Sequence, residues 1–283
     1  MAIRAYGKIN LILNVLAKRQ DNYHDLEMVM VPLLLHDLLT IRLASSYSFK
    51  TNVKYLKEQN NNIIYQVIQE MRKRYGFSEE FAIELTKYIP TQAGLGGGSS
   101  DGAAAIILLD GILGLKLSQQ EREDIANCVG KDVAFCLYNR PALVSGMGEK
   151  LAFIDNNLDL KMLLVKPGKG ISTKIAYEKL HEYPRQHYDT GKMIRALANG
   201  DYQGVVDNLG NAFEEVAQAL VPDIAQLKKQ LKDFGFDGSL LCGSGSCVLA
   251  LSQNDELLSA GLKHFRKSYP FVWQTAVKRR QDD

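Results

Sequence analysis

The composition of the chain excludes several classes of protein. The chain has 283 residues, and 34 Lys and Arg against 32 Asp and Glu give a formal net charge of +2. A chain this close to neutral is not expected to bind nucleic acid or an anionic membrane mainly through its charge. With 46% hydrophobic and 23% charged residues, it matches ordinary globular proteins, not disordered or fibrous ones. This length allows two domains of ordinary size.

Cysteine spacing and apolar runs predict a reducing, cytoplasmic location. Cys128, Cys136, Cys242 and Cys247 fit neither a C-x-x-C motif nor a compact disulfide framework, so we expect reduced, buried thiols. The apolar N-terminal stretch is interrupted by Lys8 and lacks a small-residue cleavage site, which argues against a signal peptide. The apolar runs fall far short of the ~20 residues that a membrane-spanning helix needs.

Hydrophobic periodicity predicts the elements of the first third of the chain. Two short apolar segments, residues 9–16 and 26–35, are predicted strands. Residues 63–75 repeat apolar side chains at helical spacing and end at Gly76, which predicts a helix with a glycine stop. Alternating apolar residues predict a half-buried strand over residues 81–87.

Further along the chain, the capping-box pair Ser118 and Glu121 predicts a helix that ends near Gly130. The elements expected after it are a strand at 162–165, helices at 173–181, 190–199, 202–220 and 223–234, a strand pair around a glycine-serine turn at 242–246, and a helix at 254–267 followed by an exposed charged tail. The polar stretch 155–161 is the best candidate boundary between two domains, residues 1–156 and 157–283.

A glycine-rich loop follows the predicted strand 81–87: Gly94-Leu95-Gly96-Gly97-Gly98-Ser99-Ser100-Asp101. Glycine permits backbone dihedrals that other residues rarely adopt, so successive N–H groups can turn toward one anion. The alanine-rich helix expected next adds unpaired amides and the positive end of its dipole, which favour phosphate. Because the loop joins a strand to a helix, a flexible linker is the weaker interpretation. The spacing is neither G-x-x-x-x-G-K-[ST] nor G-x-G-x-x-G.

This loop, preceded by Pro90, resembles the phosphate-binding motif P-x-x-x-G-L-G-S-S-A-A of the galactokinase, homoserine kinase, mevalonate kinase and phosphomevalonate kinase superfamily. Other segments are similar to further motifs in the same order: Lys8-Ile9-Asn10-Leu11 to K-I-N-L, Asp21-Asn22-Tyr23-His24-Asp25-Leu26-Glu27 to D-G-Y-H-x-L-x, Lys131-Asp132-Val133-Ala134-Phe135-Cys136-Leu137 to A-D-V-P-F-x-L, and Cys242-Gly243-Ser244-Gly245-Ser246-Cys247 to S-G-S-G-S-T. The set resembles the branch that phosphorylates the 2-hydroxyl of 4-diphosphocytidyl-2-C-methyl-D-erythritol in the non-mevalonate isoprenoid pathway.

The resemblance implies an ATP-dependent kinase with Lys8 and Asp132 as catalytic residues. Asp132 would receive or steer the proton of the acceptor hydroxyl, and Lys8 would keep that carboxylate ionised and polarise the hydroxyl. By residue type alone, Asp132 is more often a helix cap or a surface group, and Lys8 a lysine with its stem on apolar surface. The order of the motifs favours the catalytic interpretation.

The resemblance also implies the substrate contacts. Tyr23 would stack on the cytosine, His24 would hydrogen-bond its edge, and Tyr177 would complete an aromatic sandwich, although a tyrosine such as Tyr177 is commonly a packing residue. Asn10 is either a substrate contact or a buried amide satisfied by the backbone. The remaining candidate substrate residues are Thr173, Gly243 and Ser244, and the turn at 243–246 is equally well explained as a tight structural turn.

The cofactors implied by the resemblance are ATP and Mg²⁺. The residues expected to hold the phosphates are Ala93, Gly94, Leu95, Gly96, Gly97, Gly98, Ser99 and Ser100, and a side chain on Gly97 is expected to fill this cradle. Asn62 and Ile63 are similar to the family's pair beside adenine, although Asn62 also fits a helix N-cap. Ser100 is the candidate metal ligand.

The implied fold is α+β in two domains. The N-terminal half would resemble domain 2 of ribosomal protein S5, the C-terminal half a ferredoxin, and the active site would lie in the cleft between them. We expect a small-molecule substrate as the partner and neither nucleic acid nor a membrane, with the oligomeric state open.

Several positions depart from the family pattern. Lys131 and Gly102 stand where alanine is usual, Cys242 and Cys247 replace serine and threonine, and Arg140-Pro141-Ala142 replaces G-G-T-A. Two alternatives therefore stay open: a kinase of the same superfamily that acts on another small alcohol, and a catalytically weak paralogue that binds a nucleotide.

Overall fold

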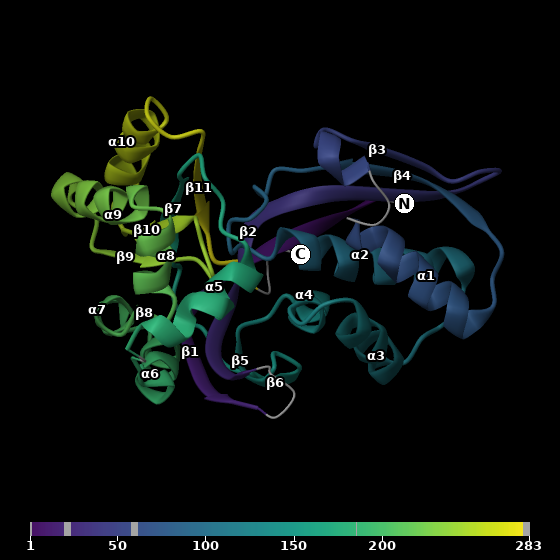
Figure 1. Ribbon diagram of the computed structural model, residues 1–283, viewed down its shortest axis with the longest axis horizontal. Helices are drawn as coiled ribbons and strands as arrows, with labels where there is room; N and C mark the ends of the chain where they lie inside the picture. Colours follow the sequence, from purple (N-terminus) through teal and green to yellow (C-terminus); the bar gives the residue numbers. More distant parts are fainter. Residues whose placement is uncertain (1, 20–23, 58–61, 185, 280–283) are drawn as a thin grey trace. The chain divides into compact units, whose positions relative to one another are not determined.

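The computed structural model describes residues 2–19, 24–57, 62–184 and 186–279, and the chain divides into two compact units. The first unit contains residues 1–7, 35–89 and 96–139, and the second contains residues 8–34, 90–95 and 140–283. Two long strands, β1 (Ala2–Lys18) and β2 (His24–Ala44), contribute residues to both units (Figure 1). The fold is α+β, as predicted; the boundary after residue 156 stays a prediction.

Strands β1 and β2 are much longer than the segments 9–16 and 26–35 predicted from sequence. β2 has antiparallel partners at both ends, because residues 38–44 pair with β4 (Glu80–Thr86) and residues 26–30 pair with β5 (Ala142–Gly146). The polar residues Lys8 and Asp37, which interrupt the apolar pattern, are buried inside the strands. Both have hydrogen-bond partners there, so a charge did not end either strand.

In the first unit, helices lie on one side of a small sheet (Figure 1). β3 (Ser48–Thr51) runs parallel to β4, and β4 pairs with the end of β2. The helical segments are η1 (Lys54–Lys57), α1 (Ile63–Tyr75), α2 (Gly97–Leu113), α3 (Gln119–Val129) and α4 (Val133–Tyr138). Helix α1 ends at Gly76 in the left-handed conformation, and α3 begins with the Ser118–Glu121 capping box, as predicted.

Helix α2 is buried along most of its length, which explains why small and apolar side chains make up most of it. Ala103, Ala104 and Ala105 are buried, and alanine has the highest helix propensity. Gly96 precedes the helix with φ 68° and Gly114 follows it with φ 65°, both left-handed. The first turn of α2 therefore begins directly at the glycine loop, with backbone amides that have no partner inside the helix.

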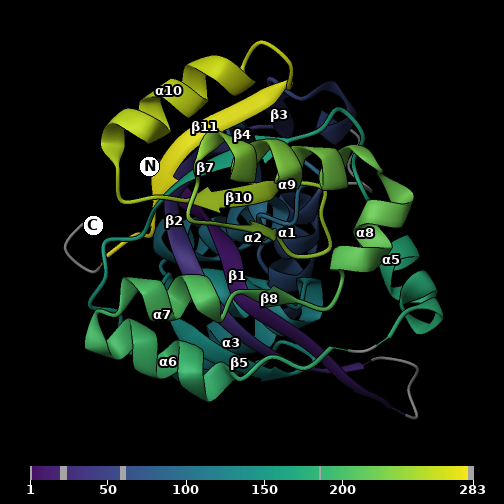
Figure 2. The same cartoon turned by 90° about the vertical axis from the view of Figure 1, so that its left-hand side faces the viewer.

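The second unit contains a four-stranded antiparallel sheet. Its strand order is β11 (Phe271–Ala276), β7 (Lys161–Lys166), β10 (Val248–Leu251) and β9 (Gly238–Leu241). Helices α9 (Asp223–Phe234) and α10 (Asp255–Phe265) pack on this sheet (Figure 2). The other elements are β6 (Lys150–Phe153), which pairs with β5, β8 (Gly210–Asn211), which runs parallel to β1, and α5 (Thr173–Lys179), η3 (Leu180–Glu182), α6 (Thr190–Asn199), α7 (Tyr202–Asp207) and α8 (Glu214–Leu220).

Two predictions in the second unit are wrong. The helix expected over 202–220 is broken into α7 and α8 by β8, because Asn211 turns its side chain to the backbone of a neighbouring turn. The expected charged tail after residue 267 contains β11, which pairs with β7. Val277 is buried, and Lys278 N donates to Pro32 O at 2.8 Å. Residues 280–283 lie outside the described residues.

The structure tests the predicted burial of the four cysteines. All four cysteines are free thiols, but Cys128 is exposed, so the prediction of four buried thiols is wrong for this one. It lies near the end of α3, where Arg74 donates to its Sγ at 3.1 Å. Within the described ranges, no helix has both the length and the hydropathy required to span a bilayer.

Candidate active site

In the second unit, the first half of the glycine loop packs against the turn between β9 and β10. A Cβ built on Gly94 would lie 1.7 Å from the carbonyl oxygen of Cys242, and one built on Gly243 would lie 2.9 Å from Gly94 O. Both glycines have positive φ, 76° and 53°. Two backbone hydrogen bonds join the same segments, Ser246 N to Gln92 O and Cys247 N to Ala93 O, each 3.3 Å. Only glycine fits this contact between backbones.

Lys8 is attached to the same loop. Its backbone N donates to Leu95 O at 3.0 Å, and its Nζ donates to Asn10 Oδ1 at 3.0 Å. Asn10 is fully buried, and its Nδ2 lies 3.2 Å from Met28 Sδ. Lys8 is 5% exposed, and the hydrogen bond to Asn10 holds its ammonium in place. Asn10 thus supports Lys8; a direct substrate contact by Asn10 stays a prediction.

In the first unit, the second half of the loop forms the first turn of α2. Ser100 N donates to Gly96 O, which starts the helical pattern, and the buried Ser100 hydroxyl donates to Gly97 O at 3.0 Å. A Cβ on Gly97 would lie 2.8 Å from Ile89 Cγ2, so a side chain there points into the core. The prediction that it would fill the cradle is therefore wrong. Among the described residues, a Cβ on Gly98 meets nothing within 4 Å.

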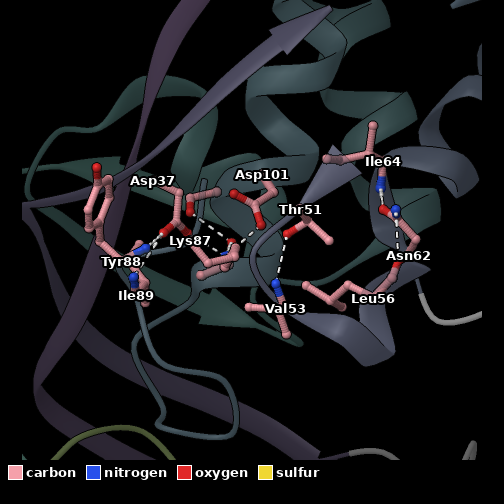
Figure 3. A network of polar contacts seen from close by, with 12 residues as sticks. Asp37, Thr51, Val53, Leu56, Asn62, Ile64, Lys87, Tyr88, Ile89 and Asp101 are labelled. Carbon is pink, nitrogen blue, oxygen red and sulfur yellow. Dashed lines mark hydrogen bonds and ion pairs between the residues drawn. The ribbon is translucent and has the colours of Figure 1, made fainter. Parts of the chain in front are cut away.

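Asn62 and Ile63 lie at the start of α1, and both contribute to packing in the first unit. Asn62 caps the helix: its Oδ1 accepts from Ile64 N at 3.0 Å, and its Nδ2 donates to Leu56 O at 3.4 Å (Figure 3). The capping interpretation is confirmed. A Cβ on Gly102 would lie 3.2 Å from Ile63 Cδ1. A methyl group at Gly102, where the family pattern has alanine, would therefore lie in tight contact with Ile63.

Asp132 lies in the first unit at the N-terminal end of α4 and is half-buried. Val133, Ala134 and Phe135 after it are buried, as its apolar context predicted. Asp132 stands at the N-cap position of α4, as the capping interpretation expected, but its carboxylate makes no capping hydrogen bond to the helix. Lys131, the departure beside it, is exposed.

In the second unit, the structure brings several predicted substrate residues together. The rings of His24 and Tyr177 stack with centroids 5.7 Å apart and an interplanar angle of 25°. Phe213 meets Tyr177 edge-on at 4.8 Å. Thr173, one turn before Tyr177 on α5, shares a hydrogen bond of 2.9 Å with Ser244. Tyr23 lies outside the described residues.

Two residues that support this group were missed from sequence, Phe213 and Asn211. Asn211 is 1% exposed, and its Nδ2 donates to both Leu241 O and Gly243 O at 2.8 Å. Its Oδ1 accepts from Phe213 N at 2.9 Å. Asn211 therefore fixes both the glycine-serine turn and the backbone of Phe213, whose ring meets Tyr177 edge-on. The pair Gly210-Asn211 in the middle of a predicted helix was the available signal, since glycine disfavours a helix interior.

Backbone amides that converge at a helix N-terminus bind phosphate groups, and the fold that presents them here is that of the small-molecule kinases. Residues 62–140 match the family model "GHMP kinases N terminal domain", and residues 193–270 match "GHMP kinases C terminal". The chain belongs to the GHMP kinase family, and it is an ATP-dependent kinase.

Full-length relatives carry a more specific name. A protein from Bacillus cytotoxicus named 4-diphosphocytidyl-2-C-methyl-D-erythritol kinase is 35% identical over 270 residues, which cover 94% of this chain and 93% of the relative. A Listeria monocytogenes protein of the same name is 38% identical over 253 residues, 89% of this chain and 87% of the relative. A crystal structure of 4-(cytidine 5'-diphospho)-2C-methyl-D-erythritol kinase superimposes with a TM-score of 0.81 at 26% identity, covering 99% of this chain and all of the other.

Proposed function

We propose that this kinase transfers the γ-phosphoryl group of ATP to the 2-hydroxyl of 4-diphosphocytidyl-2-C-methyl-D-erythritol, in the non-mevalonate isoprenoid pathway. The named relatives, similar over nearly the whole chain, support this substrate. The observation that carries the choice of acceptor is the stacked pair of His24 and Tyr177, supported by Phe213. A cytosine ring is a flat aromatic group with donors and acceptors on its edge, and such rings bind by stacking and edge hydrogen bonds.

The substrate diphosphate requires donors near this ring pair. Thr173 and Ser244 present two hydroxyls 2.9 Å apart, and the backbone of Gly243 is fixed by Asn211. We assign Thr173, Gly243 and Ser244 to the diphosphate side of the substrate. His24 and Tyr177 hold the base, together with Tyr23 as the sequence predicts.

Phosphoryl transfer depends on positioning and on neutralising charge more than on covalent chemistry. We assign the ATP phosphates to the amides of residues 96–99, at the start of α2, and the adenine to Asn62 and Ile63. Asp132 accepts or steers the proton of the 2-hydroxyl. Lys8, which Asn10 holds in place, stabilises the negative charge that develops on the reacting oxygen.

Mg²⁺ is the second cofactor in this proposal. In the described part of the chain, no group of three His, Cys, Asp or Glu side chains is placed to hold a metal. That suits Mg²⁺, which keeps several waters and binds largely through substrate phosphates. Ser100 fits as a ligand because its hydroxyl proton goes to Gly97 O and leaves an oxygen lone pair for the ion. When bound, the ion would neutralise charge on the β- and γ-phosphates.

Two functions compete with this proposal: a related kinase that acts on another small alcohol, and a catalytically weak paralogue that binds a nucleotide. The test is to incubate the purified protein with ATP, Mg²⁺ and the cytidyl substrate and to follow the product by mass spectrometry. The proposal expects one added phosphoryl group on the erythritol part and stoichiometric ADP. Phosphorylation of homoserine or mevalonate but not of the cytidyl substrate would favour the first competitor. ATP binding without transfer to any of the three would favour the second.

A cytoplasmic location remains part of the proposal, since the four thiols are free.

A further inference from the structure

Next to the start of α2, the first unit contains a buried group of three ionisable side chains that the reaction does not use directly. Lys87 is 8% exposed, Asp101 3% and Asp37 0%. The ammonium of Lys87 donates to Asp37 Oδ2 and, at 2.6 Å, to Asp101 Oδ2. Figure 3 shows Lys87 between the two carboxylates, which come from different elements, β2 and α2.

This group holds two segments: the chain just before the glycine loop and the second half of the loop. Before the loop, Asp37 Oδ1 accepts from the backbone N of Tyr88 at 2.5 Å and of Ile89 at 2.8 Å. In the second half of the loop, Lys87 Nζ donates to Gly97 O at 3.2 Å, and Asp101 lies just after the first turn of α2. The three side chains therefore connect the chain that enters the loop with the helix turn that leaves it.

A second clamp fixes the backbone of Lys87 itself. Lys87 N donates to Asn52 Oδ1 at 2.9 Å, and Asn52 Nδ2 donates to Lys87 O at 3.0 Å. The backbone of Lys87 is therefore fixed, and its ammonium donates to the Gly97 carbonyl oxygen. The Ser100 hydroxyl donates to the same oxygen. The carbonyl of Gly97 faces this buried side, so the amides of the same turn are oriented away from it, as helix geometry requires.

Stability alone is a weak reason for such an arrangement. Burying charges is costly, and well-packed apolar side chains often replace a buried ion pair with no loss of stability. Here the lysine of the ion pairs also donates a hydrogen bond to Gly97 O, a backbone carbonyl of the proposed phosphate cradle. Because phosphate binding by amides depends on their orientation, a small displacement of this turn would weaken nucleotide binding.

We propose that Lys87, held between Asp37 and Asp101, is a positioning residue for ATP: it fixes Gly97 and thereby orients the amides of the glycine loop toward the phosphates. Lys87 touches neither substrate in this role and acts through the loop backbone. The inference rests on the proposed function of the loop. It predicts that loss of the ammonium weakens ATP binding while the cytidyl substrate binds as before.

The test is the affinity for Mg²⁺–ATP and for the cytidyl substrate, measured separately by calorimetry on the full chain. Lys87→Met keeps the length of the side chain and removes its charge. We expect its Kd for ATP to rise by about tenfold or more, since the amides of the released turn are no longer held toward the phosphates, with the Kd for the cytidyl substrate unchanged. A wild-type protein that binds no ATP would refute the proposed function, whereas wild-type affinity in Lys87→Met would refute this inference alone.

Two further variants separate positioning from stability. Arg122→Met removes the ion pair with Asp110, near the other end of α2, where Asp110 also accepts from Leu117 N. It should lower the melting temperature and leave ATP affinity unchanged. If Lys87→Met does not fold, Lys87→Met with Asp101→Asn removes one unpaired carboxylate and should restore folding. We expect this double variant to bind ATP weakly; wild-type ATP affinity in a folded double variant would overturn the proposal.

Discussion

Gly94 lies so close to Cys242 that a methyl group on Gly94 would overlap the Cys242 carbonyl oxygen at 1.7 Å. The glycine loop and the glycine-serine turn thus touch through their backbones, although they are far apart in sequence. Gly94→Ala must separate them and must also place alanine at φ 76°. We expect a large fall in melting temperature and a raised KM for ATP.

Gly76→Ala is the matched control for this prediction. Gly76 has φ 70°, and its Cβ would meet no described atom within 4 Å, so it tests the left-handed strain alone, about 1–2 kcal/mol. Urea unfolding of both variants gives the comparison. Equal losses in the free energy of unfolding would mean that the two backbones do not constrain each other.

The sequence predicted most of the elements because their signals are local. Asn62, Gly76 and the Ser118–Glu121 pair mark helix ends by hydrogen bonds within one turn, and these were found. The length of β2 was not predictable in this way. Asp37 interrupts its apolar pattern, and the reason that a carboxylate is tolerated there is a lysine 50 residues further along the chain.

The candidate site shows the same division between local and distant causes. Lys8, Asn10 and Ser100 were proposed from motifs in the sequence, but the distant residues that fix other parts of the candidate site were not. Asn211 acts through Gly243 O, a contact between segments 32 residues apart that no spacing rule describes. The direction in which a Cβ on Gly97 would point, toward Ile89, likewise depends on how the turn is packed. The run of glycines in the sequence does not reveal that packing.

Gly98 and Gly97 should respond differently to a side chain. A Cβ on Gly98 meets no described atom within 4 Å, whereas one on Gly97 lies 2.8 Å from Ile89. Gly98→Val should therefore place its methyl groups where phosphate is proposed to bind, weakening ATP binding with little change in melting temperature. Gly97→Val should lower the melting temperature first. Calorimetry with Mg²⁺–ATP and thermal unfolding decide between them; the reverse pattern would contradict the assignment of Gly98 to the cradle.

Asp132→Asn and Lys8→Met should each reduce kcat while the fold stays intact. General acid–base groups contribute typically about 10²–10⁴-fold to a rate, and Met keeps the stem of the buried Lys8. Lys131→Ala, an exposed neighbour of Asp132, is the control and should leave kcat unchanged. Steady-state kinetics with circular dichroism provides the readout. Near-normal kcat in both variants would remove these residues from the mechanism.

Tyr177→Ala should raise the KM for the cytidyl substrate without changing that for ATP. Stacking of a base on an aromatic ring contributes about 1–3 kcal/mol, and the Tyr177 ring stacks with His24 and meets Phe213 edge-on. Tyr177→Phe keeps the ring and should restore most of the affinity. An effect confined to the KM for ATP, or equal losses in both variants, would contradict stacking. The sequence predicts the same pattern for Tyr23→Ala.

Asp101 should make the stability of the protein depend on pH. Burial, opposed by Lys87 and reinforced by Asp37, raises the pKa of Asp101 from 3.8 to about 7. In the unfolded chain the same carboxyl loses its proton near pH 4. Between these values the folded state binds the additional proton, so this contribution to the free energy of unfolding is complete below pH 4 and is lost as pH rises toward 7.

Asp101→Asn removes this titration while keeping an oxygen that can accept from Lys87. The free energy of unfolding of Asp101→Asn, relative to that of the wild type, should therefore increase as pH rises from 5 to 8. The charged groups that act on Asp101 are Lys87 and Asp37, and the amide leaves both in place. Urea unfolding of the two proteins at several pH values measures the difference. Parallel pH profiles would mean that Asp101 is already ionised at pH 5 in the folded protein, with Lys87 outweighing the effect of burial.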